Sequence, residues 1–196
     1  MPGMRVVEAI RSLLEQVGPA ILVTHSMAGA FGWKLAELCP DRVRAIVGVA
    51  PSPPGNIQPW WSWPAYPEDR PIEPMAEEVR HFTDSPTFPN EAFDRYYQSI
   101  VPESARIYNE RLNVRGMQLQ VEEPARLRGT PMLVVSAERD PNHAGNTDSR
   151  TADFLGAEHI SLADLGLRDH GHLMMLEHGN LAIADVILGW LDRHLR

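Results

Sequence analysis

Apolar residues recur every three or four positions near both ends of the chain. Residues 3–17 show this spacing and stop at Gly18-Pro19, which predicts an amphipathic helix. Residues 181–195 show it again and predict a closing helix. Two shorter helices are predicted between these, at 27–38 and at 148–156.

Short, continuous apolar runs separate these helical stretches. Such a run is typical of a strand that is buried on both faces, as in a parallel sheet. The order helix, strand, helix, strand, with short links, predicts a parallel sheet with crossover helices on both faces. The four predicted strands are 20–23, 43–50, 131–136 and 159–165.

The middle of the chain breaks this alternation. Eleven of the 17 prolines lie from Pro51 to Pro102, and such a density interrupts regular elements. We therefore expect irregular chain with short helices around 75–82 and 91–110. A long insertion in a regular α/β pattern is typical of a lid. The sequence predicts a single domain, with a core at 1–51 and 119–196 and a lid at 52–118.

Composition and charge exclude several classes of protein. The 196 residues are 43% hydrophobic and carry a net charge of −8, whereas nucleic acids and anionic membranes attract a basic face. No apolar run reaches the roughly 18–20 residues of a membrane span. The amphipathic start contains Glu8 and Glu15, unlike a secretory signal peptide. The single cysteine, Cys39, excludes an internal disulfide. We expect a soluble, cytoplasmic protein.

The segment ILVTHSMAGAFG, residues 21–32, carries the first candidate chemistry. A buried strand runs directly through Ser26 into a helix. A serine at such a corner sits on a tight, strained turn that exposes its hydroxyl above the sheet. The backbone N–H of Met27, at the start of the helix, would point at a developing oxyanion.

This corner departs from the usual pattern of small residues. The positions two before and two after the serine hold Thr24 and Ala28, where glycines fit best, and Gly29 follows them. The alternative is that Thr24 and Ser26 only cap the helix. The corner alone leaves both interpretations open.

The order of later residues favours the catalytic interpretation. Asp140 follows the strand PMLVVS, and His172 lies between the last strand and the last helix. Parallel strands bring their carboxyl ends to one edge of a sheet, where open α/β folds hold their sites. A serine needs a general base, and the base needs an orienting carboxylate. Singly, Asp140 and His172 are ordinary loop residues; in the order serine, aspartate, histidine they predict a triad.

These residues resemble the α/β-hydrolase family from about residue 3 to the C-terminus, and a subgroup of bacterial esterases in particular. The resemblance implies Ser26 as nucleophile, His172 as base and the Met27 N–H as one oxyanion donor. The subgroup's acid position corresponds to Ala50 here, so the acid is expected at Asp140. The matching pieces are THSMAG, PDRVRAIVGVA, PMLVVSAERD and GHLMMLEHGNLAIADVILGWL.

Complete members of that family have further strands before the corner strand, including a loop with the second oxyanion N–H. The resemblance therefore implies that this chain lacks the N-terminal half of the fold. Loss of one oxyanion donor typically costs about 100- to 1000-fold in turnover. An uncovered edge strand also predicts self-association, so a homo-oligomer is expected.

Other candidate residues carry less weight. His25 is expected to be structural and to pack on the sheet. His143, His170, His172 and His178 match no metal-ligand spacing, so no metal site is expected. Asp169 and Glu177 lie too close in sequence to His172 to orient its ring well. The tryptophans of the middle segment fill space under a lid or line a substrate pocket; they are Trp60, Trp61 and Trp63.

Together these features predict a carboxylic ester hydrolase that acts through an acyl-enzyme. The expected partner is a small-molecule ester, with no metal or organic cofactor, no nucleic acid and no membrane. Activity should fall as the pH drops through the range where imidazole titrates, near 6.5. Lactonase, amidase and acyltransferase activities use the same triad. The alternative is a catalytically silent fragment or small-molecule-binding module that lacks half of its oxyanion hole.

Overall fold

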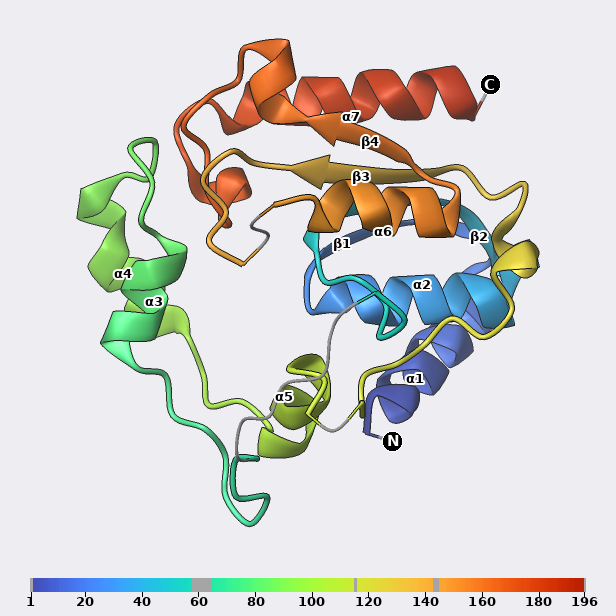
Figure 1. Ribbon diagram of the computed structural model, residues 1–196, viewed down its shortest axis with the longest axis horizontal. Helices are drawn as coiled ribbons and strands as arrows, with labels where there is room; N and C mark the ends of the chain where they lie inside the picture. Colours follow the sequence, from blue (N-terminus) through green and yellow to red (C-terminus); the bar gives the residue numbers. More distant parts are fainter. Residues whose placement is uncertain (1, 58–64, 115, 143–144, 196) are drawn as a thin grey trace.

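A four-stranded parallel sheet forms the centre of the molecule (Figure 1). The computed structural model describes residues 2–57, 65–114, 116–142 and 145–195. The strands lie side by side in the order in which they follow along the chain, as the apolar runs predicted. They are β1 (Ala20–Ser26), β2 (Val43–Pro51), β3 (Met132–Ser136) and β4 (Glu158–Ser161).

Helices cover both faces of this sheet (Figure 1). One face packs against α1 (Pro2–Val17), α2 (Ala28–Leu38) and α6 (Thr147–Leu155), with the fully buried Trp33 in its core. The other face packs against α7 (Asn180–His194), with the fully buried Trp190 in a second core. Two separate apolar cores, one on each side, are what a strand buried on both faces requires.

The described residues between β2 and β3, 52–57, 65–114 and 116–131, form three short α-helices and no further strand of the sheet. They are α3 (Ala76–Phe82), α4 (Phe93–Ser99) and α5 (Ala105–Arg111). The short helices expected around 91–110 are two, α4 and α5, with an interruption between them. Between them, Pro102 lacks the N–H that a helix needs, and Glu103 pairs with Ile72 in an isolated antiparallel bridge. The expected lid role of this middle segment stays a prediction.

The last predicted strand is shorter than the apolar run indicated. β4 ends at Ser161, opposite Ser136, because β3 ends there and offers no further backbone partner. The chain continues as a 3-10 helix over Leu162–Leu165 and turns at Gly166 in a left-handed conformation. Similar 3-10 turns occur at Pro40–Arg42, Asn90–Ala92, Pro124–Leu127 and Met174–Leu176.

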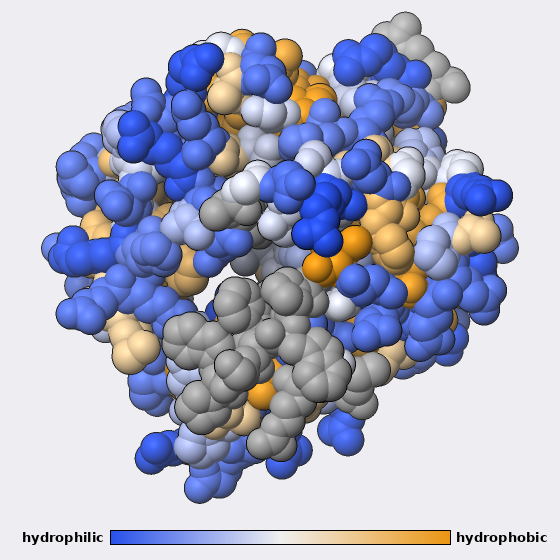
Figure 2. Space-filling view, viewed as in Figure 1, coloured by the Kyte–Doolittle hydropathy of each residue, from blue (hydrophilic) through white to orange (hydrophobic). Residues whose placement is uncertain are grey.

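The surface is mainly hydrophilic on the face drawn in Figure 2, and it is hollowed near the centre. Within the described ranges, no helix is both long and apolar enough to cross a membrane. The edge strand β1 exposes two apolar side chains, Ile21 at 38% and Val23 at 64%. The expected homo-oligomer through this edge stays a prediction.

Candidate active site

Ser26 lies at the sharp corner where β1 ends and α2 begins. Its φ angle of 51° lies in the left-handed region, which is unfavourable for a residue with a Cβ atom. Met27 follows as the N-cap of α2, so its backbone N–H lies at the positive end of the helix dipole. The corner therefore holds the hydroxyl and a hydrogen-bond donor side by side.

Close packing of α2 against the sheet makes this corner possible. A Cβ atom on Gly29 would lie 2.6 Å from Pro51 Cβ and 2.8 Å from the backbone oxygen of Ser52. A Cβ atom on Gly32 would lie 3.0 Å from Thr24 Cγ2. The glycines needed at the corner thus stand on the helix, which explains why Thr24 is tolerated on the strand.

The side chains of Ser26, His172 and Asp140 form one hydrogen-bonded series. Nε2 of His172 lies 3.0 Å from Ser26 Oγ, and Nδ1 of His172 lies 2.8 Å from Asp140 Oδ2. The structure thus brings together the three residues that the sequence order singled out. They meet at the carboxyl edge of the sheet because each follows the end of a parallel strand.

Burial restricts both His172 and Asp140, and a backbone contact holds Asp140 further. His172 is 4% exposed and Asp140 is 7% exposed, so their interaction is largely shielded from water. The second carboxylate oxygen of Asp140 accepts a hydrogen bond from the backbone N–H of Asn142 at 2.9 Å. Asp140 is therefore held with one oxygen toward the imidazole.

Two aromatic rings flank the imidazole of His172. The His25 ring centroid lies 4.8 Å away and the Phe82 ring centroid lies 5.4 Å away. Nε2 of His25 also donates a hydrogen bond to the backbone oxygen of His172 at 2.9 Å. His25 thus packs against the imidazole that faces Ser26. The sequence did not indicate this contact with His172.

The alternative acids point elsewhere. Asp169 pairs with the exposed Arg139, with 2.9 Å between Oδ1 and Nε. Glu177 faces Nδ1 of His170 at 2.8 Å. Ala50, at the end of β2, is fully buried and offers no carboxylate. Of the acids weighed from the sequence, Asp140 is the one bonded to His172.

A cavity of about 380 Å³ opens beside Ser26 and His172. Its walls come from α2 and from the middle segment, which supplies α3, α4 and α5. Hydrophobic periodicity did not predict these wall residues, because they are spread over short elements with no periodic pattern. The apolar side chains of the wall include Phe31, Met75, Val79, Phe82, Ile100 and Leu173.

Charged side chains line another part of this cavity. The hydroxyl of Tyr108 donates a hydrogen bond to Glu78, and the Arg111 guanidinium lies 4.1 Å over the Tyr108 ring. Burial raises the pKa of the Tyr108 phenol and of the Glu103 carboxyl, because each loses hydration. For Glu103 the positive charge of Arg111 acts in the opposite direction. The cavity thus combines an apolar wall with a polar one.

Two expectations involve residues outside the described ranges. Trp60, Trp61 and Trp63 lie there, so their expected place in a substrate pocket stays a prediction. His143 also lies there. In the described part of the chain, no group of three or more potential metal ligands comes together.

Comparison with known proteins now identifies the family. The sequence pattern of the alpha/beta hydrolase family matches residues 3–186. The chain belongs to the alpha/beta hydrolase family. This alpha/beta hydrolase has the four parallel strands with surrounding helices that the sequence predicted.

A probable lipase is among the relatives of this alpha/beta hydrolase. The chain is 30% identical over 194 residues to probable secreted lipase phiG of Fungal sp. (strain ATCC 74256), with 95% of this chain and 49% of the lipase covered. The chain thus spans about half the length of that lipase.

Solved structures share the fold at low sequence identity. A putative lipase, lip1 of Acinetobacter baumannii AYE, matches with a TM-score of 0.69 at 14% identity, covering 97% of this chain and 67% of that one. A novel bacterial esterase matches with a TM-score of 0.53 at 19% identity, covering 97% and 43%. At these identities the likeness concerns the fold alone.

Proposed function

We propose that this protein hydrolyses carboxylic esters, with Ser26 as nucleophile, His172 as general base and Asp140 as the acid that orients it. The observation that carries the proposal is the hydrogen-bonded series from Ser26 Oγ through His172 to Asp140. Serine activated by an adjacent base, itself oriented by a third group, is the arrangement used for acyl transfer.

In the first step, Nε2 of His172 accepts the Ser26 proton while Oγ attacks the ester carbonyl carbon. The carbonyl oxygen becomes an oxyanion, to which the Met27 N–H donates a hydrogen bond. Asp140 stabilises the imidazolium that forms. The tetrahedral intermediate then collapses, and His172 gives its proton to the leaving alcohol. The acyl group remains bound to Ser26.

In the second step, His172 accepts a proton from a water molecule, whose oxygen attacks the acyl-enzyme carbonyl. The second intermediate collapses, and the imidazolium returns the proton to Ser26 Oγ. The carboxylic acid is released and the enzyme is regenerated. No cofactor is needed for either half of this cycle.

The cavity beside Ser26 supports a small ester as substrate. Its volume of about 380 Å³ lies near the lower end of the roughly 300–1,000 Å³ typical of small-molecule pockets. The apolar wall suits an acyl chain or an aromatic ring. We therefore expect short and medium acyl chains to be preferred over long ones.

Hydrolysis of a series of p-nitrophenyl esters by the purified chain, beside Ser26→Ala, tests the proposal. Turnover of the butyrate and octanoate esters that disappears in Ser26→Ala is the expected result. Weak or absent turnover of the palmitate ester is expected from the cavity volume.

A different outcome would favour another function. Equal rates for the wild type and Ser26→Ala would exclude Ser26 as nucleophile. If an ester analogue then bound without turnover, the chain would be a small-molecule-binding module of the same fold.

A further inference from the structure

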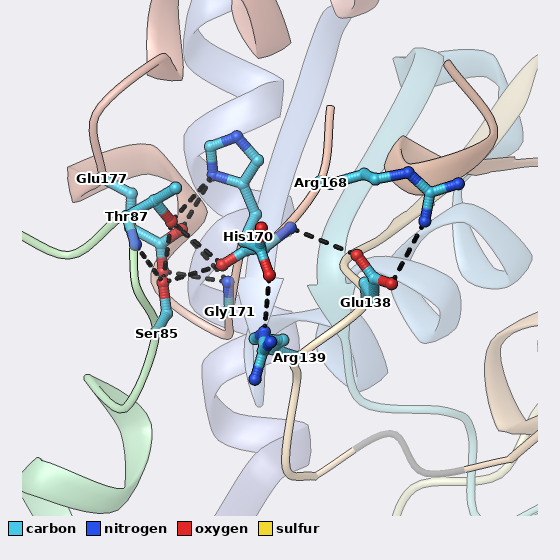
Figure 3. Close-up of polar contacts among 9 residues, drawn as sticks. Ser85, Thr87, Glu138, Arg139, Arg168, His170, Gly171 and Glu177 are labelled. Atoms are coloured by element: carbon cyan, nitrogen blue, oxygen red, sulfur yellow. Dashed lines mark hydrogen bonds and ion pairs between the residues drawn. The ribbon is translucent and has the colours of Figure 1, made fainter. Parts of the chain in front are cut away.

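The loop that carries His172 is folded around one buried carboxylate, that of Glu177. This side chain is 1% exposed, so it depends on hydrogen-bond donors from the protein for its solvation. Nδ1 of His170 lies 2.8 Å from Glu177 Oε2, and Thr87 Oγ1 donates to the same oxygen at 2.7 Å. Figure 3 shows these groups converging on the carboxylate from two segments of the chain.

The same carboxylate fixes the peptide group between His170 and Gly171, one residue before His172. The N–H of Gly171 is shared between the two Glu177 oxygens, at 3.0 and 3.1 Å. On the other side of this peptide, the backbone oxygen of His170 accepts a hydrogen bond from the N–H of Arg139 at 2.9 Å. Arg139 directly precedes Asp140. His172 thus follows a residue that Glu177 contacts, and Asp140 follows a residue that bonds the other side of the same peptide group.

The middle segment, residues 52–118, also hydrogen-bonds to the loop that carries His172. Thr87 O accepts a hydrogen bond from the N–H of His178 at 2.8 Å, and Ser85 Oγ donates to Asp169 O at 3.1 Å. Residues 85–87 follow α3, whose Phe82 lies against the His172 ring and lines the cavity. Glu177 thus joins the substrate-facing segment to the loop of the base (Figure 3).

A buried carboxylate is a poor device for stability alone, since apolar side chains of similar volume often serve equally well. It is well suited to fixing the orientation of neighbouring groups, because charge-assisted hydrogen bonds are strong and hold their donors in place. We propose that Glu177, braced by Thr87, is a positioning residue for His172 that keeps Nε2 directed at Ser26. Glu177 does not touch the substrate. The inference rests on the proposed ester hydrolysis for its kinetic test.

Thr87→Val, Thr87→Ser and Glu177→Gln test this role with p-nitrophenyl butyrate. Thr87→Val keeps the shape but loses the hydroxyl, and Thr87→Ser keeps the hydroxyl. Because a misplacement of about 1 Å can cost about 100-fold, we expect kcat to fall about 3- to 10-fold in Thr87→Val and about 10- to 100-fold in Glu177→Gln. KM should stay within about twofold in both, and Thr87→Ser should keep wild-type kcat. An unchanged kcat in folded Thr87→Val, with only a lower melting temperature, would overturn the proposal.

A second measurement does not depend on turnover. The proton on Nδ1 of His172, which is hydrogen-bonded to Asp140, should give a low-field proton NMR signal. This signal should disappear in Asp140→Asn, and its disappearance assigns it to this proton. We expect this signal in the wild type and in Thr87→Ser, and a shifted or broadened signal in Thr87→Val and Glu177→Gln. If esters are not hydrolysed at all, the proposed function fails and this signal still decides the positioning role. An identical signal in all folded variants would contradict the positioning role.

Discussion

Ser26 and Asp140 illustrate how single residues at this site depend on their surroundings. Ser26 adopts a φ of 51°, which costs on the order of 1–2 kcal/mol for a residue with a Cβ atom. The packing of α2 on the sheet holds the residue in this conformation. The strain exposes the hydroxyl, so the same feature that costs stability serves the proposed chemistry.

Asp140→Asn should remove most of the activity without unfolding the protein. An amide retains the shape of the carboxylate but favours the wrong tautomer of His172 and cannot stabilise its charge. In a serine protease the equivalent change costs about 10⁴-fold, so we expect kcat/KM for p-nitrophenyl butyrate to fall by about 10³- to 10⁴-fold.

Asp169→Asn is the matched control for this change. Asp169 lies in the same region, but it pairs with the exposed Arg139, and exposed pairs contribute little. Its kcat/KM should stay within about threefold of the wild type. If Asp169→Asn were the inactive variant instead, the assignment of the acid to Asp140 would be wrong.

At the scale of elements, the contact between α2 and the end of β2 decides whether the corner can form. Gly29 lies where a side chain would meet Pro51 and the backbone of Ser52. The backbone cannot yield as a flexible side chain can. The helix must therefore shift if any Cβ atom is added here.

Gly29→Ala should lower the free energy of unfolding by about 1–3 kcal/mol, the usual cost of overpacking. Gly189→Ala, in the middle of α7, is the control. Its added Cβ would lie 3.7 Å from a flexible Arg193 side chain, and alanine favours a helix by about 0.5–1 kcal/mol over glycine. Urea unfolding should thus show opposite signs for the two variants. Equal effects would mean that α2 is not packed as described.

At the scale of the whole molecule, contacts distant in sequence join the middle segment to the ends of the chain. The buried carboxylate of Glu110, in α5, accepts a hydrogen bond from the N–H of Gly3, in α1, at 2.9 Å. Burial raises the pKa of Glu110, because the carboxylate loses hydration, although the Gly3 hydrogen bond acts in the opposite direction.

This shift predicts a pH-dependent effect of Glu110→Gln. A carboxyl group whose pKa is higher in the folded state stabilises the fold at low pH and loses that contribution as the pH rises through the folded pKa. Glutamine does not titrate. The unfolding free energy of the variant minus that of the wild type should therefore be more positive at pH 8 than at pH 4. Urea unfolding at both pH values checks this, with the exposed Glu91→Gln as baseline. A difference that stays constant or falls would contradict it.

Periodicity was sufficient for much of the fold. Apolar spacing predicted α1, α2, α7 and the four strands. The helices each bury one face in the cores beside the sheet, and the strands form the sheet between those cores. The ends of individual elements depended instead on their backbone hydrogen-bond partners in other parts of the chain. β4 ends where β3 stops pairing, and the interruption between α4 and α5 depends on the bridge from Glu103 to Ile72. Neither partner is adjacent in sequence.

The sequence by itself determined the family, the parallel sheet and the candidates Ser26, Asp140 and His172, because strand order and the corner segment are local patterns. The tertiary structure decided which of the three carboxylates faces His172, since their loops direct Asp140 to the imidazole and Asp169 and Glu177 to other partners. It also decided the cavity walls and the contacts of Glu177. A buried carboxylate that takes donors from residues 87, 170 and 171 leaves no periodic pattern, since its partners meet only when the chain has folded.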